Sequence, residues 1–290
     1  MKKRYESSEL IVNADKSIFH LHLHPEQIAD KIILVGDLGR VDVISGYFDT
    51  IESEAQNREF KTVTGTYKGK QITVVATGIG TDNIDIVVNE LDALANIDLD
   101  KREDKDAFRK LTFVRIGTCG GLQKNIPVDS FLVSEQSIGF DGVLNYYANR
   151  DSVCDLDFEQ AFIQQTGYSS KLTAPYCIHS TPSLVDRIAQ TDMLRGITIS
   201  APGFYGPQGR ELRLPLAFPD LNQRIEDFEY KGKKITNYEM ESSAIAGLAT
   251  LMGHEAMTVC VVIANRMLKQ FSKDYHPAVK KLVELVLERI

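Results

Sequence analysis

The stretch "LVGDLGRVDVI" (residues 34–44) decides the fold, because it joins an apolar run to a helical pattern through a glycine-rich turn. The run that leads into it, "KIILVG" (31–36), is β-branched and almost continuously hydrophobic, which is typical of a strand buried on both faces. Gly36 and Gly39 let the backbone approach a ligand, and a helix start together with Arg40 supplies positive potential. The turn is therefore either an anion site or simply a tight connection, and the strand–turn–helix order indicates an α/β fold.

Similar apolar runs recur along the chain and extend this pattern. We expect strands at 71–80, 111–118, 128–136, 196–200 and 256–266, a hairpin at 66–74, and amphipathic helices at 81–95, 241–254 and 276–290. The charged segment 96–110 is interpreted as a solvated excursion. No repeat and no linker rich in Pro, Gly and Ser interrupts the sequence. We therefore predict one domain over residues 1–290, with a central mixed β-sheet flanked by helices.

Composition narrows the classes of function. The chain has 290 residues, 43% of them hydrophobic, and a net charge of -7 with no long block of Lys and Arg. Nucleic-acid binding needs clustered positive charge, so we expect a small-molecule partner and no nucleic acid. No stretch has the character of a signal peptide or a membrane span, so no membrane partner is expected. The cysteines are widely spaced without a CxxC pair, which favours a reducing, cytoplasmic location; they are Cys119, Cys154, Cys177 and Cys260.

A second candidate anion site lies in "VRIGTCGGL" (114–122). Arg115 stands within an otherwise apolar strand, and Thr118 follows near the carboxyl end, where ligands collect in α/β sheets. A buried arginine is costly unless it meets an opposite charge. That charge is either a bound anion or a protein carboxylate. Cys119 is not expected to be a nucleophile, because no histidine lies near it in the sequence.

Two carboxylates precede the helical pattern at 241–254. In "TNYEMESSAIAG" (236–247), Glu239 and Glu241 flank Met240. They form either an ordinary acidic first turn, stabilised by the helix dipole, or a site for two adjacent hydroxyls. A carboxylate has two acceptor oxygens, so it can bind both hydroxyls of a ribose diol.

Two further segments carry planar or ring side chains. In "GFYGPQGREL" (203–212), Gln208 and Arg210 stand two positions apart, after Phe204. In "IFHLHLH" (18–24), His20, His22 and His24 would share one face of any strand formed there. The histidines have no carboxylate or cysteine partner at ligand spacing, so we expect no metal site.

Taken in order from about residue 18 to 285, these motifs resemble the nucleoside phosphorylase-I family, and most closely its uridine phosphorylase branch. The segments that carry the resemblance are "IFHLHL", "GDLGR", "NREF", "ATGIG", "RIGTCGG", "NYEMES" and the Phe-x-x-x-Gln-x-Arg pattern at 204–210. The resemblance implies an α/β domain whose central mixed sheet is partly barrel-like and flanked by helices.

The resemblance also implies a role for each matched residue. Phosphate would be bound by Gly36, Arg40, Arg115 and Thr118, with Arg58 from a neighbouring subunit. The ribose would be bound by Glu241, Met240 and Glu239, with His20 from the neighbour. The base would meet Phe204, Gln208 and Arg210, and the catalytic residues would be Arg210, Gln208 and Glu241.

The implied reaction is phosphorolysis of uridine to uracil and ribose 1-phosphate, with deoxyuridine and thymidine as open alternatives. Phosphate would attack C1′ through an oxocarbenium-like sugar, and donors aimed at the uracil oxygens would stabilise the charge that develops there. Inorganic phosphate is then a co-substrate, and no cofactor is needed. The implied assembly is a homodimer with shared active sites, or a hexamer built as a trimer of dimers.

Some positions depart from the family pattern, and other functions stay open. Leu38 replaces a proline of the phosphate loop; Glu59 matches one residue of the family's monovalent-cation site, but Asn83 stands where a serine is expected. The alternatives are a purine nucleoside phosphorylase or nucleosidase of the same fold, and a non-catalytic nucleoside-binding protein. The purine enzymes carry a Ser-Asp pair where this chain has Ala264 and Asn265, which favours the pyrimidine hypothesis.

Overall fold

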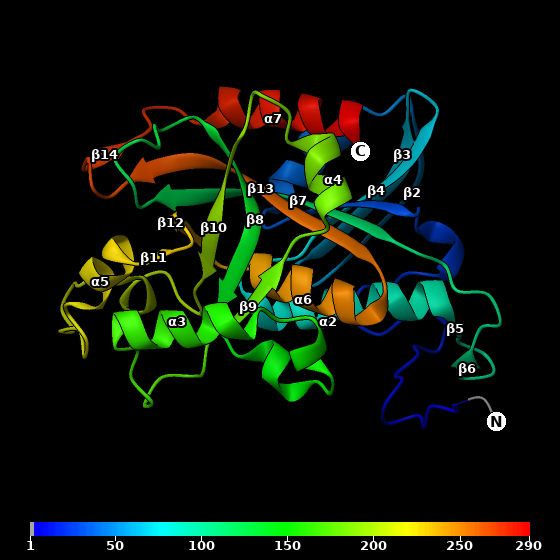
Figure 1. The fold of residues 1–290 in the computed structure, drawn as a ribbon. Coiled ribbons are helices and arrows are strands. Elements are labelled where there is room, and N and C mark those ends of the chain that lie inside the picture. Colours follow the sequence, from blue (N-terminus) through cyan, green and yellow to red (C-terminus); the bar gives the residue numbers. More distant parts are fainter. Residues whose placement is uncertain (1–2) are drawn as a thin grey trace.

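The computed structural model describes residues 3–290, within which a twisted sheet of twelve strands carries helices on both sides (Figure 1). The strands are β1 (Lys31–Val35), β2 (Thr50–Asn57), β3 (Phe60–Tyr67), β4 (Lys70–Ala76), β5 (Ile97–Asp98), β6 (Glu103–Asp104), β7 (Thr112–Gly121), β8 (Phe131–Gly139), β9 (Tyr176–His179), β10 (Leu194–Ser200), β11 (Glu229–Tyr230), β12 (Lys233–Glu239), β13 (Glu255–Asn265) and β14 (Gln270–Phe271). The pair β5–β6 lies apart from the large sheet.

The helices connect these strands. The α-helices are α1 (Leu38–Ser45), α2 (Thr81–Asn96), α3 (Leu156–Thr166), α4 (Pro182–Ile188), α5 (Leu221–Asp227), α6 (Ser242–Met252) and α7 (His276–Arg289). Short 3-10 helices are η1 (Pro25–Gln27), η2 (Val143–Tyr146), η3 (Arg150–Ser152) and η4 (Gly206–Gln208).

The sheet is mixed and closes on itself at one end. β4, β1, β7 and β13 are parallel neighbours, while β8 pairs antiparallel with β13 and parallel with β10. β12 is parallel to β10 and also pairs antiparallel with β7, where Tyr238 lies opposite Gly120. β7, β13, β8, β10 and β12 therefore form a closed ring. The predicted mixed, partly barrel-like sheet flanked by helices is confirmed.

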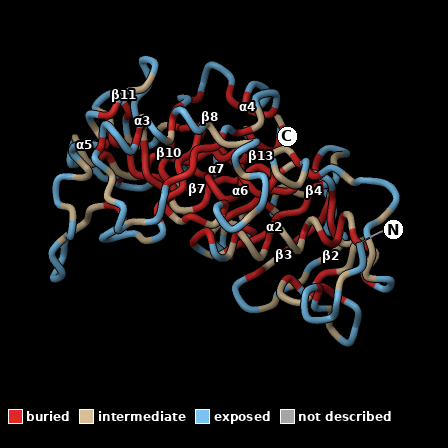
Figure 2. Tube along the Cα trace, turned by 60° about the horizontal axis from the view of Figure 1, so that its bottom comes forward, coloured by how far each residue is buried: buried red, intermediate tan, exposed pale blue. Residues whose placement is uncertain are grey.

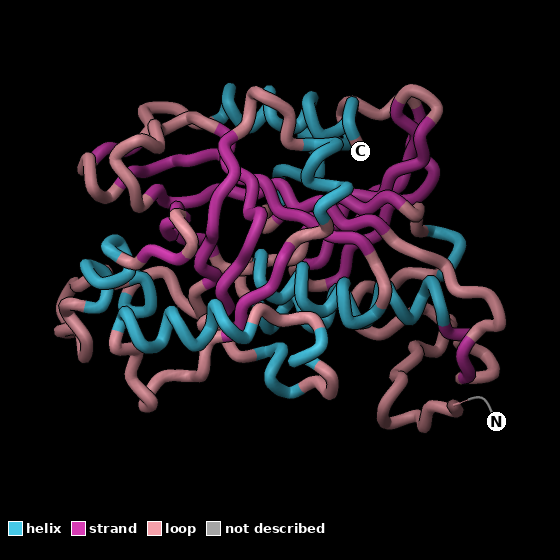
Figure 3. Tube along the Cα trace, viewed as in Figure 1, coloured by secondary structure: helices cyan, strands magenta, loops and turns pink. Residues whose placement is uncertain are grey.

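Helices cover both faces of the sheet and leave a continuous buried interior. One face packs against α1, α4 and α7, and the other packs against α2 and α6. Figures 1 and 3 show α4 and α7 on the side of the sheet opposite α2 and α6. α3 and α5 enclose a third apolar cluster with β10 and β12. Figure 2 shows buried chain running through the middle of the molecule. This packed interior fixes the positions of the strand ends.

Most local expectations hold. The three predicted amphipathic helices form, and α6 is capped by Gly253, whose φ of 85° is the left-handed conformation of a helix C-terminal cap. The hairpin between β3 and β4 turns at Lys68 and Gly69, both with positive φ. The strand expected at 128–136 lies three residues later, at Phe131–Gly139.

Two expectations are wrong or incomplete. Segment 18–24 forms a turn rather than a strand, because His22 has a φ of 55° and its N–H bonds back to the Ile18 carbonyl. The histidines therefore share no strand face. Segment 96–110 is only partly exposed: Ile97 and Leu99 are buried, β5 pairs with β6, and Lys105 Nζ donates to the Leu94 carbonyl.

Candidate active site

The strand–turn–helix at the start of the sheet delivers a guanidinium to its carboxyl edge. Asp37 caps α1, since its carboxylate accepts from the Gly39 N–H at 2.9 Å. Arg40, in the first turn of α1, donates Nη1 to the Ile116 carbonyl on β7 at 3.1 Å. Burial lowers the pKa of Arg40, and the neighbouring charge of Arg115 lowers that pKa further. The charge of Arg115 therefore disfavours the charged form of Arg40, while the Asp37 carboxylate favours it.

Arg115 is buried in β7, with 5% of the residue exposed. Its Nη2 pairs with the Glu241 carboxylate, and its Nη1 lies 3.4 Å from Glu239 Oε2. Burial alone would lower the pKa of Arg115, but these two carboxylates outweigh burial and raise it. The internal carboxylate partner left open by the sequence is therefore present, while the buried Nε has no hydrogen-bond partner. A side chain at Gly117 would collide with the Arg115 guanidinium, so this position requires glycine.

Glu239 and Glu241 have different surroundings. Glu239 accepts from the N–H groups of Glu241 and Ser242 at 2.8 and 2.9 Å and from the Ser200 hydroxyl at 2.5 Å. It acts as the acidic group at the start of α6. Glu241 accepts from the Gly80 N–H at 2.8 Å through Oε1 and from Arg115 through Oε2. Each Glu241 oxygen therefore keeps capacity to accept another hydrogen bond.

The segment around η4 presents the predicted base-binding residues. Gln208 is buried, with 3% exposed, although Phe204 and Tyr205 beside it are exposed. Arg210 donates Nη1 to Gln208 Oε1 at 2.5 Å and to the Phe204 carbonyl at 2.7 Å. The Arg210 guanidinium carbon also lies 3.9 Å from the centre of the Phe204 ring. Guanidinium, amide and ring thus form one contiguous unit.

These segments line a single cavity of about 510 Å³. It gathers side chains from β7, β12, α1, the η4 segment and the end of β13. The predicted site residues that line it are Gly36, Arg40, Arg115, Thr118, Phe204, Gln208, Arg210, Glu239, Met240 and Glu241. Residues predicted from segments far apart in the sequence are therefore brought together.

The two residues assigned to a neighbouring subunit do not line this cavity. Arg58 lies in the turn between β2 and β3, with its guanidinium carbon 5.9 Å from the centre of the Phe19 ring. Asn57 donates Nδ2 to the His20 carbonyl at 2.8 Å, so Arg58 and His20 belong to one surface region. The His20 ring contacts Glu90 Oε1 through Nδ1 at 2.6 Å.

Glu59 and Asn83 both border Gly78, where an added Cβ would lie 3.4 Å from Glu59 Cγ and 2.5 Å from Asn83 Nδ2. Within residues 3–290, no three side chains of His, Cys, Asp or Glu cluster as metal ligands do. In the same part of the chain, no helix combines the length and apolar character that crossing a bilayer requires.

Sequence reasoning missed a set of residues around the η4 segment. Arg266, just after β13, lines the cavity and donates Nη2 to the Gly209 carbonyl at 3.0 Å. Asn222 on α5 donates Nδ2 to the Gln208 carbonyl at 3.0 Å and accepts from the Tyr238 hydroxyl. An arginine directly after a buried strand was a usable signal for Arg266. Asn222 carried no such signal.

The site and the fold define a class of protein, and a family comparison agrees. Residues 30–290 match the model of the phosphorylase superfamily. The chain belongs to this superfamily, and the resemblance to nucleoside phosphorylases is confirmed.

Individual relatives refine this placement. The uridine phosphorylase of Thermococcus kodakarensis is 30% identical over 275 residues, which cover 94% of this chain and 86% of that protein. A guanosine phosphorylase of Halorubrum lacusprofundi is 34% identical over 246 residues, covering 85% of this chain and 83% of that protein. Among solved structures, a Trypanosoma brucei nucleoside phosphorylase described as showing uridine phosphorylase activity superposes with a TM-score of 0.84 at 31% identity, covering 97% of this chain and 99% of that one.

Proposed function

We propose that this protein is a pentosyltransferase that cleaves uridine with inorganic phosphate, yielding uracil and ribose 1-phosphate. One observation carries the proposal. A single cavity presents the Arg40–Arg115 pair, the Glu241 carboxylate and the Gln208–Arg210 pair, which match a phosphate, a sugar diol and a pyrimidine. The relatives named as uridine phosphorylases support the same choice.

The phosphate is assigned to the two arginines. The charge of Arg115 disfavours the charged form of Arg40, and an anion bound between the two guanidinium groups would relieve this repulsion. The buried Nε of Arg115 has no hydrogen-bond partner, so it is a further donor that a bound phosphate oxygen could accept from. Thr118 and the backbone at Gly36 border the same cavity and complete the proposed phosphate site.

The ribose is assigned to Glu241. Its two oxygens each hold one protein donor and can each accept a sugar hydroxyl as well. Glu239 is occupied by backbone and serine donors, so its proposed role is to support the start of α6 rather than to bind the sugar. Met240 lines the cavity between the two carboxylates in sequence and would pack on the sugar.

The base is assigned to the η4 segment. Gln208 Nε2 and Arg210 can donate to uracil carbonyl oxygens, while Gln208 Oε1 can accept from the ring N–H. Negative charge spreads onto those oxygens as the glycosidic bond breaks, so these donors stabilise the transition state more than bound uridine. No carboxylic acid stands at Ala264–Arg266 to protonate a purine ring, and Asn265 is occupied by the carbonyls of Gln123 and Ile126.

The proposed chemistry is a direct displacement. Phosphate attacks C1′ from the face opposite the base, the glycosidic electron pair leaves with uracil, and positive charge develops on the sugar ring in the transition state. Inorganic phosphate is the co-substrate, and this scheme needs no cofactor and no covalent intermediate. Catalysis rests on positioning and on donors aimed at developing charge.

We also propose that two chains share each site. Arg58 and His20 lie together outside the cavity of their own chain, as expected if both reach a neighbour's cavity. A homodimer, or a hexamer built as a trimer of dimers, would supply that neighbour. The proposal further treats residues 1–290 as one domain, because one sheet joins β1 to β14. A cytoplasmic location stays a prediction from the sequence.

The proposal is tested by measuring base release from uridine with and without inorganic phosphate. Inosine and guanosine are run in parallel, since one relative is named a guanosine phosphorylase. We expect phosphate-dependent release of uracil and much slower release of the purine bases. Preference for a purine nucleoside would assign the site to the purine alternative. Tight uridine binding without turnover would support the non-catalytic alternative.

A further inference from the structure

The turn that carries Gln208 and Arg210 lies between β10 and α5 and belongs to no strand of the sheet. Its internal bonds run from the N–H groups of Gln208 and Arg210 to the Tyr205 carbonyl, at 3.0 and 2.9 Å. Tyr205, Gly206 and Pro207 are exposed. Side chains on such a turn need contacts from other elements to hold them in place, because a small displacement of reacting groups lowers the reaction rate by a large factor.

That support reaches the turn through two consecutive backbone carbonyls. Arg266 donates Nη1 to the Gln208 carbonyl and Nη2 to the Gly209 carbonyl, the latter at 3.0 Å. Asn222 Nδ2 donates to the Gln208 carbonyl as well, at 3.0 Å. Arg266 also lines the cavity, so its direct and indirect roles cannot be separated by substitution.

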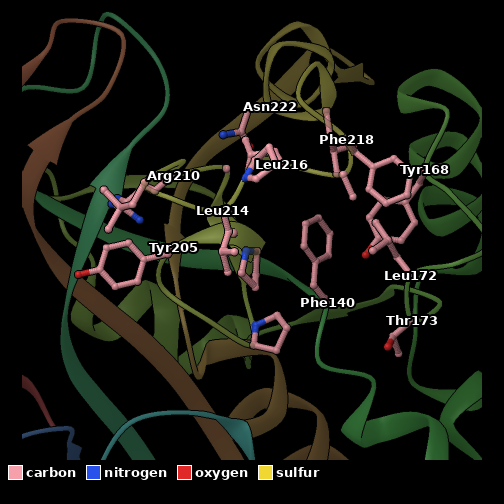
Figure 4. A pocket seen from close by; sticks show the side chains of 18 of the residues that line it. Phe140, Tyr168, Leu172, Thr173, Tyr205, Arg210, Leu214, Leu216, Phe218 and Asn222 are labelled. Carbon is pink, nitrogen blue, oxygen red and sulfur yellow. The ribbon is translucent and has the colours of Figure 1, made fainter.

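Asn222 is different because it does not line the cavity proposed to bind the nucleoside. It lines a second, mostly apolar cavity of about 710 Å³. Figure 4 shows Asn222, Arg210 and Tyr205 toward one side of this second cavity and Phe140 and Tyr168 toward the other. Arg210 lines both cavities, whereas Asn222 lines only the second and contacts the turn through the Gln208 carbonyl.

The hydrogen bonds of Asn222 allow only one orientation of its amide. The Gln208 carbonyl can only accept, so the Asn222 NH₂ faces it. The Asn222 oxygen then faces the Tyr238 hydroxyl at 3.0 Å, and that hydroxyl must donate. Tyr238 is buried in β12, the strand that ends at Glu239. Asn222 thus links the strand leading to the ribose carboxylates with the turn that reads the base.

The space around Gly209 agrees with this link. Gly209 has a φ of 66°, and a Cβ placed there would collide with the Asn222 side-chain amide. Glycine at 209 is therefore required both by the backbone conformation and by the close approach of Asn222.

We propose that Asn222 is a positioning residue for pyrimidine recognition. It acts by fixing the position of the Gln208 backbone relative to Tyr238 of β12. This inference rests on the proposed function. It assigns Asn222 no contact with the substrate. Its removal should impair recognition of the nucleoside while leaving the phosphate site, built on β7 and α1, unchanged.

The test is a double-mutant cycle between Asn222→Ala and Gln208→Ala in the full chain, with steady-state kinetics for uridine and for phosphate. Because the Gln208 carbonyl loses its bond to Asn222, Asn222→Ala should lower kcat/KM for uridine about tenfold and leave the KM for phosphate within about twofold. In the Gln208→Ala background, the effect of Asn222→Ala should shrink to about twofold or less, because the two residues act as one unit.

Matched variants separate this role from general stability. Asn222→Asp keeps the acceptor for Tyr238 but loses the donor to Gln208, so it should be as impaired as Asn222→Ala. Asn145→Ala removes an equivalent side-chain-to-backbone bond elsewhere, from Nδ2 to the Ala174 carbonyl at 3.0 Å, and should keep normal kinetics. Thermal unfolding is measured for each variant.

The outcomes distinguish the two proposals. If the unmodified protein releases uracil but the cycle is additive, or Asn222→Asp behaves normally, the positioning role is overturned and the proposed function stands. An equal rise in the KM values for uridine and phosphate would also overturn it, since it would indicate a general structural effect. If the unmodified protein neither binds nor cleaves uridine, both proposals fall.

Discussion

The two parts of the cavity are held in place by different means. Arg115, Glu239 and Glu241 are 5, 4 and 2% exposed and stand within or directly after buried strands. Phe204 and Tyr205, near Gln208, which is proposed to bind the base, are 49 and 54% exposed on a loop. The sheet positions the residues proposed to bind phosphate and ribose, whereas Asn222 of α5 and Arg266, just after β13, donate to carbonyls of the turn proposed to bind the base. Base preference can therefore change through a loop while the proposed phosphate and ribose chemistry stays constant.

Substitution of Arg115 should have the largest effect on both activity and stability. Arg115→Met should lower kcat/KM for phosphorolysis about 10³-fold, because it removes a donor aimed at developing charge in a buried site. It should also lower the free energy of unfolding by about 3–5 kcal/mol, since Glu239 and Glu241 would stay buried without a counter-charge. Kinetics and urea unfolding measure the two effects.

A surface arginine gives the control for this substitution. Arg195 pairs with the exposed Asp186 at 2.7 Å, so Arg195→Met should change unfolding by no more than about 1 kcal/mol and leave turnover intact. An Arg115→Met variant that folds normally and keeps turnover within about tenfold of normal would contradict the proposed phosphate site.

The turn proposed to bind the base should respond differently. Arg210→Met should lower kcat/KM for uridine about 10²-fold while leaving stability nearly unchanged, because Arg210 is only partly buried and its bonds are to the turn itself. Kinetics for uridine and phosphate measure the loss of activity, and thermal unfolding measures the change in stability. A comparable loss of stability in Arg115→Met and Arg210→Met would remove the contrast between the two parts.

The proposal that two chains share each site predicts that Arg58 acts in the cavity of a neighbouring chain. Arg58→Ala and Arg115→Ala should each be inactive alone, and chains mixed after dissociation should recover about a quarter of normal activity. Half of the dimers formed at random are mixed, and each mixed dimer has one intact site of two. Recovery is measured after mass spectrometry verifies heterodimers. Verified heterodimers without activity would place Arg58 outside the site.

The smallest effect concerns the pH dependence of stability. Burial raises the pKa of Glu241 above its ordinary value of 4.5, against the opposing influence of Arg115. The folded state thus holds this proton more tightly than the unfolded chain. The stability contributed by the proton is present below pH 4.5 and is lost as the pH rises through the folded pKa. The free energy of unfolding of the unmodified protein, relative to Glu241→Gln, should therefore fall from about pH 4 to pH 7. Urea unfolding at several pH values checks the sign, and a difference that rises over this range would contradict it.

The same contrast explains what the sequence could predict. The strand at 31–35, the turn at Gly36 and the helix capped by Gly253 are set by local patterns of apolar residues and glycines, and all three form as expected. Residues attached to such elements, including Arg115 and Glu241, converge at the edge of the sheet for the same reason.

Other parts depended on contacts between distant segments. Asn222, Tyr238 and Arg266 come from three separate elements, and no local pattern in the sequence marks Asn222 as a partner of Gln208. The turn at 18–24 was missed because alternating histidines and apolar residues imitate a strand, whereas His22 adopts a positive φ. The pairing of β12 with β7, which closes the ring of strands, joins residues more than a hundred positions apart.

The most direct measurement is phosphorus NMR of the unmodified protein with uridine and inorganic phosphate, combined with chromatography of the released base. We expect a ribose 1-phosphate resonance to grow in step with uracil while the inorganic phosphate signal falls by the same amount. Uracil released without an organic phosphate product would show that water, rather than phosphate, attacks the sugar. That result would contradict the assignment of Arg40 and Arg115 to a phosphate co-substrate.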